Sequence, residues 1–163
     1  MQRGYDLEQH RSEAKKLNPQ PYIELYEVRV NPSAVLRLTN HPTVEWNGFT
    51  WENWALELTG CSVKTTGEAS RPQLKMANLN GAFSFAANSG WLYQGSITRY
   101  RVLEQDLHNN RPSYLRNFWD LAKIASLNKD SIVLELRAPM DRQDYKLPAR
   151  QFFPPEFPYV TLR

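Results

Sequence analysis

The stretch Val44-Glu-Trp-Asn-Gly-Phe-Thr-Trp51 places an Asn-Gly pair between two short runs rich in aromatic and β-branched residues. A type I′ turn needs positive φ angles at both central residues, and Asn-Gly adopts these angles readily. The stretch therefore predicts a β-hairpin over residues 44–51. Trp46 and Trp51 form an aromatic cluster with the nearby Trp54. Packing in a core or an interface is the favoured role for this cluster, and stacking on sugar rings stays open as a second role.

Strand patterns continue on both sides of this hairpin. Residues 22–30 carry apolar groups on both faces, which suits a strand that is covered on both sides. Further strands are expected at 35–39, 54–58, 73–79, 96–104 and 131–137. Residues 114–127 fit a helical stripe as well as strand alternation, so periodicity alone does not decide. The tight turn at 128–130, followed by a clear strand, favours a strand there too.

Helical patterns are short. Residues 5–17 read as an amphipathic helix that ends before Asn18-Pro19, because a residue before proline is pushed out of the helical region. Its predicted apolar face consists of Leu7, Ala14 and Leu17, with Tyr5 able to join them. So thin a stripe predicts docking on the main body or on a neighbouring subunit. Residues 82–88 predict one or two helical turns, and residues 106–113 predict a polar loop.

Length and composition indicate one ordinary domain, or one domain with an appended arm. The chain has 163 residues, 41% hydrophobic and 12% aromatic, with 11 prolines against 7 glycines. A chain of this size buries about 70% of its unfolded surface, so it needs no metal or disulfide to hold a core. We predict a mainly β fold, a barrel or sandwich of about eight strands with a short N-terminal helix and an extended C-terminal arm. The predicted divisions are the helix with its linker (residues 1–20), the β-domain (residues 21–147) and the arm (residues 148–163).

Charge and cysteine content exclude several classes of protein. The net charge is +3, and no basic run exceeds Lys15-Lys16, so specific nucleic-acid binding is not expected. The N-terminus is charged and lacks an apolar core, so it is not a secretory signal. The uncharged stretch 76–98 is long enough to span a membrane but is too rich in Asn, Ser and Gly. Cys61 is the single cysteine, which rules out an intrachain disulfide and fits a reducing compartment.

Catalytic patterns are weak. The sequence contains no glycine-rich phosphate-binding motif, and its three histidines are far apart and lack a second ligand at metal spacing. Asp141 and Asp144 lie three residues apart and offer a candidate carboxylate pair for a glycosidase. The neighbouring Arg142 would hold both ionised, which is wrong for a general acid and favours a charged loop. The chain is therefore not expected to be an enzyme.

One further stretch carries a resemblance: Thr65-Thr-Gly-Glu-Ala-Ser-Arg-Pro-Gln-Leu-Lys-Met-Ala-Asn-Leu-Asn-Gly81. It resembles a recurrent element of the minor tail protein L family of lambda-like long-tailed phages. The matching positions are Gly67, Ser70, Arg71, Pro72, Leu74, Asn78 and Gly81. The order of the surrounding elements is similar too, from the charged N-terminal helix to Ala138-Pro139 and the late Leu147-Pro-Ala-Arg150, and the resemblance covers most of residues 5–150.

The resemblance implies a structural protein of the virion. Members of this family look like adaptors at the tail tip that join the ring of distal tail protein to the central hub protein. It implies a homo-oligomeric ring, most simply a trimer, that is assembled in the host cytoplasm. Many members continue into a segment with four cysteines that holds an iron–sulfur cluster. Because this chain has only Cys61, no cofactor is expected within it. The alternatives are a carbohydrate-binding module that uses the tryptophan hairpin and a cell-wall hydrolase that uses the aspartates.

Two sets of residues are predicted to form interfaces. Within the motif, Gly67 and Gly81 permit positive φ angles, and Pro72 forces Arg71 to be extended. Arg71 then presents a guanidinium either to a neighbouring subunit or to an intrachain carboxylate, and these two roles stay open. The first set comprises Arg71, Pro72, Asn78 and Gly81. The second set lies on the arm beside Pro148, Pro154, Pro155 and Pro158 and comprises Phe152, Phe153, Phe157 and Tyr159.

Overall fold

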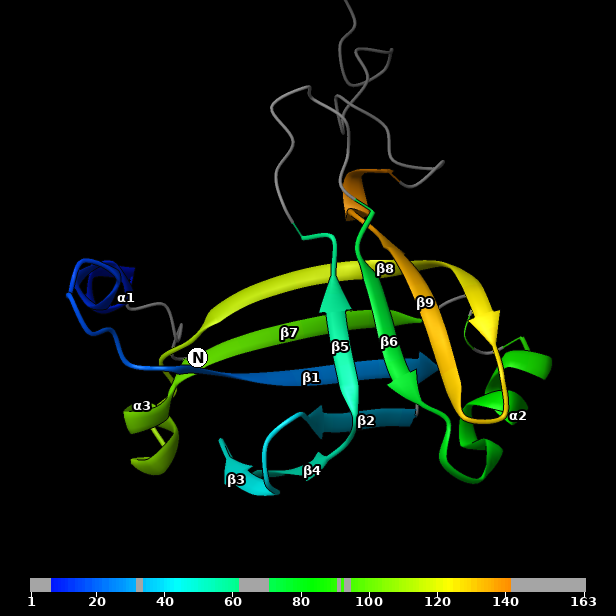
Figure 1. Cartoon of the computed structure of the whole chain (residues 1–163), viewed down its shortest axis with the longest axis horizontal. Helices are drawn as coiled ribbons and strands as arrows, with labels where there is room; N and C mark the ends of the chain where they lie inside the picture. The colour runs from blue at the N-terminus through cyan, green and yellow to red at the C-terminus, as the bar shows by residue number, and fades with distance from the viewer. Residues whose placement is uncertain (1–6, 32–33, 62–70, 91, 93–94, 142–163) are drawn as a thin grey trace, which may run out of the picture.

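A computed structural model describes residues 7–31, 34–61, 71–90, 92 and 95–141. Within these residues, nine strands form one sheet in the order β3-β4-β2-β1-β7-β8-β9-β6-β5 (Figure 1). The strands are β1 (Tyr22–Asn31), β2 (Ala34–Thr39), β3 (Val44–Trp46), β4 (Phe49–Asn53), β5 (Leu56–Thr59), β6 (Gln73–Ala77), β7 (Ser96–Leu103), β8 (Leu115–Leu127) and β9 (Ser131–Arg137). The helical elements are α1 (Leu7–Ala14), η1 (Leu79–Gly81), α2 (Ala82–Asn88), α3 (Glu104–His108) and η3 (Pro139–Asp141). The predicted mainly β class with a short N-terminal helix is confirmed, and residues 115–127 are a strand.

The sheet curls so that one sheet supplies two layers. All strand pairs are antiparallel except β2 with β4, which run parallel at Leu38 and Thr39. The pairing of β8 with β9 has two register shifts, at 121–123 and 124–126. Such bulges bend a strand and increase its twist. The strands β9, β6 and β5 accordingly cross in front of β1, β7 and β8 (Figure 1).

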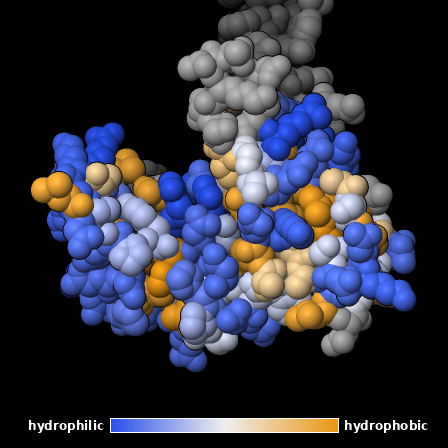
Figure 2. Space-filling model, in the orientation of Figure 1, coloured by the Kyte–Doolittle hydropathy of each residue, from blue (hydrophilic) through white to orange (hydrophobic). Residues whose placement is uncertain are grey.

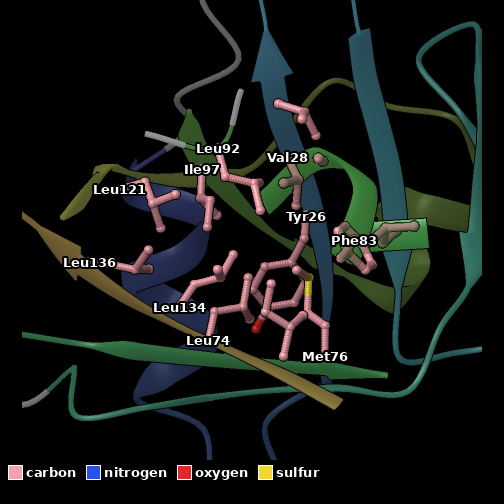
Figure 3. Close-up of a cluster of buried hydrophobic side chains, with 14 residues drawn as sticks. Tyr26, Val28, Leu74, Met76, Phe83, Leu92, Ile97, Leu121, Leu134 and Leu136 are labelled. Atoms are coloured by element: carbon pink, nitrogen blue, oxygen red, sulfur yellow. The ribbon is translucent and has the colours of Figure 1, made fainter. Parts of the chain in front are cut away.

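Apolar side chains fill the space between these two layers. We call this group the central cluster; its buried members are Tyr26, Val28, Val30, Leu38, Leu74, Met76, Phe83, Ala86, Leu92, Ile97, Leu121, Ile132, Leu134 and Leu136. Figure 3 shows Leu74, Met76 and Leu134 gathered near the Tyr26 ring. Helix α2 contributes Phe83 and Ala86, so this helix closes one end of the curl.

A second apolar group lies on the opposite face of β1 and β7. Successive side chains of a strand point to opposite faces. Tyr26 and Val28 therefore enter the central cluster, while Ile23 and Leu25 face the other way. We call the group on that side the outer cluster; its buried members are Ile23, Leu25, Trp46, Trp51, Val102 and Leu107. The prediction that residues 22–30 are covered on both sides is confirmed.

The β3–β4 hairpin covers the outer cluster. Asn47 and Gly48 have φ angles of 53° and 77°, as the Asn-Gly pair predicts. Trp46 and Trp51 are each only 2% exposed, and the Trp46 indole N–H donates to the carbonyl of Arg111 at 3.0 Å. Trp54 packs elsewhere, edge-on against Phe83 at the central cluster. The packing role of the tryptophans is confirmed, and this burial leaves Trp46 and Trp51 unable to stack on sugar rings.

Helix α1 docks with the opposite face from the one predicted. Leu7, Ala14 and the nearby Leu17 are exposed, while His10 and Glu13 are buried. The reason is that the body of the domain offers polar partners to this helix. The His10 ring stacks on Tyr22, with 5.7 Å between centroids, and its Nδ1 lies 3.2 Å from the Tyr22 hydroxyl. The predicted apolar face is therefore wrong, although docking on the main body is confirmed.

Residues 104–108 form helix α3, where a polar loop was expected from residue 106 onward. Leu107 enters the outer cluster, and Asp106 is buried. The Asp106 carboxylate accepts a hydrogen bond from the Gln9 side chain of α1 at 2.9 Å. The backbone carbonyl of Asp106 accepts one from the Arg111 N–H at 2.8 Å. The polar sequence of residues 104–108 is typical of a loop. The helix could not be predicted because the partner of the buried Asp106 carboxylate, Gln9, is distant along the chain.

Candidate interaction surfaces

The first predicted interface residues lie where β6 begins. Pro72 is buried, and its carbonyl accepts a hydrogen bond from the Leu136 N–H at 2.8 Å. The Arg71 side chain is 72% exposed, and its Nη1 lies 3.4 Å from Oε1 of Glu135. Lys123 pairs with the other oxygen of the same carboxylate at 3.3 Å. The intrachain ion pair considered for Arg71 is therefore present, and most of the guanidinium still faces solvent.

Asn78 serves the interior of the fold. It is 1% exposed, and its side-chain amide donates to the Ser84 hydroxyl and to the Asn128 carbonyl, each at 2.9 Å. Its side-chain oxygen accepts the Phe83 N–H at 3.0 Å. Asn78 thus ties the end of β6 to α2 and to the β8–β9 turn. Because these bonds occupy its side chain, the structure supports a folding role for Asn78, and direct contact with a partner does not fit its burial.

Gly81 occupies the position where the chain turns from η1 into α2. Its φ angle is 70°, a conformation that side-chain-bearing residues rarely adopt. A Cβ at this position would meet only Ser84, at 3.8 Å, so backbone conformation and not crowding calls for glycine. The predicted positive φ is confirmed. Gly67 and the arm residues Phe152, Phe153, Phe157 and Tyr159 lie outside the described residues, and their predicted interface roles remain predictions.

Apolar side chains are exposed at both ends of the molecule. Helices α1 and α2 lie at opposite ends of the long axis (Figure 1). At one end Leu7 is 49% exposed, and Figure 2 shows hydrophobic residues on the surface there. At the other end Leu79 and Phe85 are exposed. Large exposed apolar side chains that gather at one place are typical of protein interaction sites.

A polar cluster lies on the inner face of β1, β7 and β8, beyond the central cluster. Arg99 lies 3.3 Å from Glu24 through Nη1 and donates to the Asn117 side chain at 3.1 Å. The Tyr26 hydroxyl donates to the second oxygen of Glu24, and burial with this hydrogen bond raises the pKa of Tyr26. Arg101 stacks over the Tyr22 ring, with Cζ 5.7 Å from the centroid. This cluster was not predicted from the sequence, although Arg99-Tyr-Arg101 alternates within a strand and so puts two arginines on one face.

A pocket of about 580 Å³ lies beside the start of β5. Its lining comes from β4, β5, β6 and the β8–β9 turn, and includes Asn53, Trp54, Glu57, Lys75 and Asp130. These residues mix both charges with amides, and no nucleophile–base pair stands among them. The pocket lies beside β5, the end strand of the sheet, and forms part of that sheet edge.

The described residues show little that is typical of a catalytic or metal-binding site. Within the described ranges there is no group of three or more His, Cys, Asp or Glu side chains placed to hold a metal ion. His10 is buried against Tyr22, which accounts for it without a metal ion. Asp141 is exposed in η3, and Asp144 lies outside the described residues. In the described part of the chain, no helix has the length and apolar character needed to cross a membrane.

The curled sheet is similar in fold to chains of solved structures. One of these matches is a chain of the "Virion of native gene transfer agent (GTA) particle", with a TM-score of 0.58 and 15% sequence identity. The match covers 88% of this chain and 48% of that chain, so this chain spans about half the length of its structural relative. No curated protein sequence matches the chain.

The family is given by the sequence. The profile of the family described as Phage minor tail protein L matches residues 36–162, which is most of the chain. The chain therefore belongs to the phage minor tail protein L family. It is a structural protein of the phage tail, and the resemblance carried by residues 65–81 is confirmed.

Proposed function

We propose that this tail protein is an adaptor at the tail tip, where it joins the ring of distal tail protein to the central hub protein. The observation that carries the proposal is family membership over residues 36–162. An adaptor must hold two different partners at once. Exposed Leu7 at the α1 end and exposed Leu79 and Phe85 at the α2 end offer two separate surfaces for this.

Binding of the purified full chain to each neighbour tests the proposal. The chain is mixed with distal tail protein alone, with hub protein alone and with both, and the complexes are separated by size-exclusion chromatography. We expect both binary complexes and a ternary complex. Direct binding of hub to distal ring that is unchanged by this chain would contradict the adaptor role.

We further propose that the chain acts as a closed ring, most simply a trimer. A ring needs two different surfaces on each subunit, so that one surface of a copy contacts the other surface of the next. These surfaces must differ from the two apolar ends, which the adaptor role assigns to the distal tail protein and the hub. Mass photometry of the assembled ring tests the stoichiometry. Six equivalent copies would contradict the trimer and would leave the adaptor role intact.

The aromatic arm, residues 151–163, is proposed to lie on the hub or on the next subunit. Prolines lower the conformational entropy of a free segment, so docking it costs less, and aromatic side chains are frequent anchors at interfaces. Deleting residues 151–163 should leave the melting temperature within about 2 °C, since it should remove no part of the core. It should also stop tail assembly at the distal ring. A melting temperature lowered by many degrees, with assembly intact, would place the arm on its own domain.

We also propose that the chain has no catalytic role and needs no cofactor of its own. The family is one of structural tail proteins. Metal analysis of the purified full chain tests the cofactor part of this proposal. Stoichiometric iron and sulfide in the protein would contradict it.

A further inference from the structure

Strand β5 is the last strand of the sheet in the described part of the chain, and some of its backbone groups do not pair with β6. Among the described strands it pairs with β6 alone. The Ala77 N–H donates to the Ala55 carbonyl at 2.9 Å, so residue 55 directs its backbone groups toward β6. In an antiparallel ladder this direction alternates, and the N–H and C=O groups of Leu56 and Leu58 therefore point to the open side. Such an edge is a template for a strand from another chain.

One arginine on the inner face of β7 has no carboxylate partner among the described residues. Glu24 lies opposite Arg101 in the β1–β7 register, yet its two oxygens are taken by Arg99 and by the Tyr26 hydroxyl. Within the described residues, Arg101 contacts the Tyr22 ring and no acid. The Nε atoms of Arg99 and Arg101 are both buried without a hydrogen-bond partner there. Two arginines therefore share one carboxylate, and burial of the unmatched charge is costly until an anion binds.

The open edge and the arginines lie close together. Strand β5 crosses in front of β1 and β7 (Figure 1), and Cys61 follows two residues after its end. Burial raises the pKa of the Cys61 thiol, and the charges of Arg99, Glu24 and Arg101 also act on it. The end of β5 therefore lies near the arginine pair. The side chains of Leu56 and Leu58 turn inward against the central cluster, so a strand added to β5 would also direct alternate side chains inward.

We propose that the β5 edge binds an extended segment of another tail protein by strand addition, and that an acidic side chain of this segment pairs with Arg101. Backbone pairing with Leu56 and Leu58 supplies affinity, and the inward side chains supply specificity. A carboxylate suits a guanidinium that is half-buried and unpaired. Nucleic acid offers phosphates to Arg101 but has no peptide groups for the strand edge. The proposal rests on the adaptor function only in taking the partner from among the tail proteins.

Amide hydrogen exchange at single-residue resolution tests the strand addition. It compares the free full chain with the chain in assembled tails. The Leu56 and Leu58 amides should exchange quickly in the free chain and be protected by about 100-fold in tails, because exchange follows local opening. Unchanged exchange at these two amides would overturn the proposal. Protection that appears in the free chain at high concentration would show that the occupant is a second copy, and protection lost on nuclease treatment would show nucleic acid.

Two matched variants test the acidic contact. Arg101→Gln removes the unpaired charge, whereas Arg116→Gln removes an arginine on the other face of the neighbouring strand, where Arg116 pairs with Tyr100. Arg101→Gln should lower tail assembly by about tenfold, equivalent to about 1.4 kcal/mol of binding. Its melting temperature should stay unchanged, and Arg116→Gln should assemble normally. Equal assembly of the two variants would overturn the acidic contact.

Strand addition at β5 and the adaptor function can be disproved independently of each other. Protected Leu56 and Leu58 amides in a protein found elsewhere in the tail would support strand addition and contradict the adaptor role. Unprotected Leu56 and Leu58 amides in a protein that bridges the distal ring and the hub would contradict strand addition and support the adaptor role.

Discussion

The central and outer clusters lie on opposite faces of the same two strands and are built differently. The central cluster is mainly aliphatic, and it is covered by β6, β9 and α2, which come from distant parts of the chain. The outer cluster depends on Trp46 and Trp51, which a short local hairpin places over β1 and β7. The first cluster needs the whole sheet to exist. The second needs a sheet that is already formed and adds a small cover to it.

This difference predicts which cluster controls unfolding. Regions with few buried contacts open locally at lower free energy than the core does. The outer cover comprises a three-residue strand, a five-residue strand and a five-residue helix. Damage to the central cluster should therefore unfold the domain, and damage to the outer cluster should loosen the hairpin and α3 first.

The largest expected effect follows from truncation in the central cluster. Leu134 is fully buried on β9, opposite Leu74 and Ile124. Leu134→Ala should lower the free energy of unfolding by about 2–5 kcal/mol, because a cavity replaces buried methyl groups. Urea denaturation followed by circular dichroism measures this. Leu36→Ala, at a partly exposed position on β2, is the control and should cost much less. Equal losses for the two variants would contradict the assignment of the core.

Asn78→Ala should have the next largest effect. It removes the acceptor of the Phe83 N–H and both donations that link α2 to the β8–β9 turn. Leaving buried polar groups without partners should lower the free energy of unfolding by about 1–3 kcal/mol. Asn78→Asp keeps the acceptor and should lie between Asn78→Ala and the native protein. An Asn78→Ala variant of native stability that fails to assemble would instead give Asn78 a direct role at an interface.

Local rules of the chain predict much of this fold, and distant contacts explain the failures. The Asn47-Gly48 hairpin was predictable because two positive φ angles select that pair. Strand β8 was predictable only through the turn and strand that follow it. Helix α3 was missed because buried Asp106 is satisfied by Gln9, which lies far away in the sequence. The predicted docking face of α1 was wrong for the same reason, because the burial of His10 depends on its contact with Tyr22.

In the outer cluster, Trp46→Phe should cost about 1–2 kcal/mol, because it removes the hydrogen bond to the Arg111 carbonyl and part of the ring contact. The loss should appear as faster exchange of hairpin amides, with little change in the melting of the sheet. Trp54→Phe is the matched control, because it removes an indole bond to the Ala77 carbonyl at the central cluster. Identical exchange patterns in the two variants would show that the clusters are not independent.

Arg71→Ala lies outside both clusters and should have the smallest effect on stability. Because its ion pair with Glu135 is exposed on the arginine side, the free energy of unfolding should change by less than about 0.5 kcal/mol. Tail assembly is the second measurement. Glu135→Gln breaks the same ion pair and serves as the control. Loss of assembly in Arg71→Ala alone supports a contact with a neighbouring subunit, and equal behaviour of the two variants would contradict such a contact.

The interaction surfaces were less predictable than the fold. The motif predicted the positive φ of Gly81 and the extended presentation of Arg71, since both follow from local backbone chemistry. It did not predict that the Asn78 side chain is buried and hydrogen-bonded to α2 and to the β8–β9 turn. Nor did any linear pattern indicate that Arg101 lacks an acid, because this depends on Glu24 pairing diagonally with Arg99 across two strands. Pairing across a sheet sets such relations, and a single sequence does not show them.

A cryo-EM reconstruction of assembled tails tests the central claim most directly. The account predicts density for this curled sheet at the tail tip, in a ring between the distal tail protein and the hub, with the two ends of each copy in contact with different neighbours. Density for this chain away from the tip, or tails that are complete at the tip without it, would contradict the account.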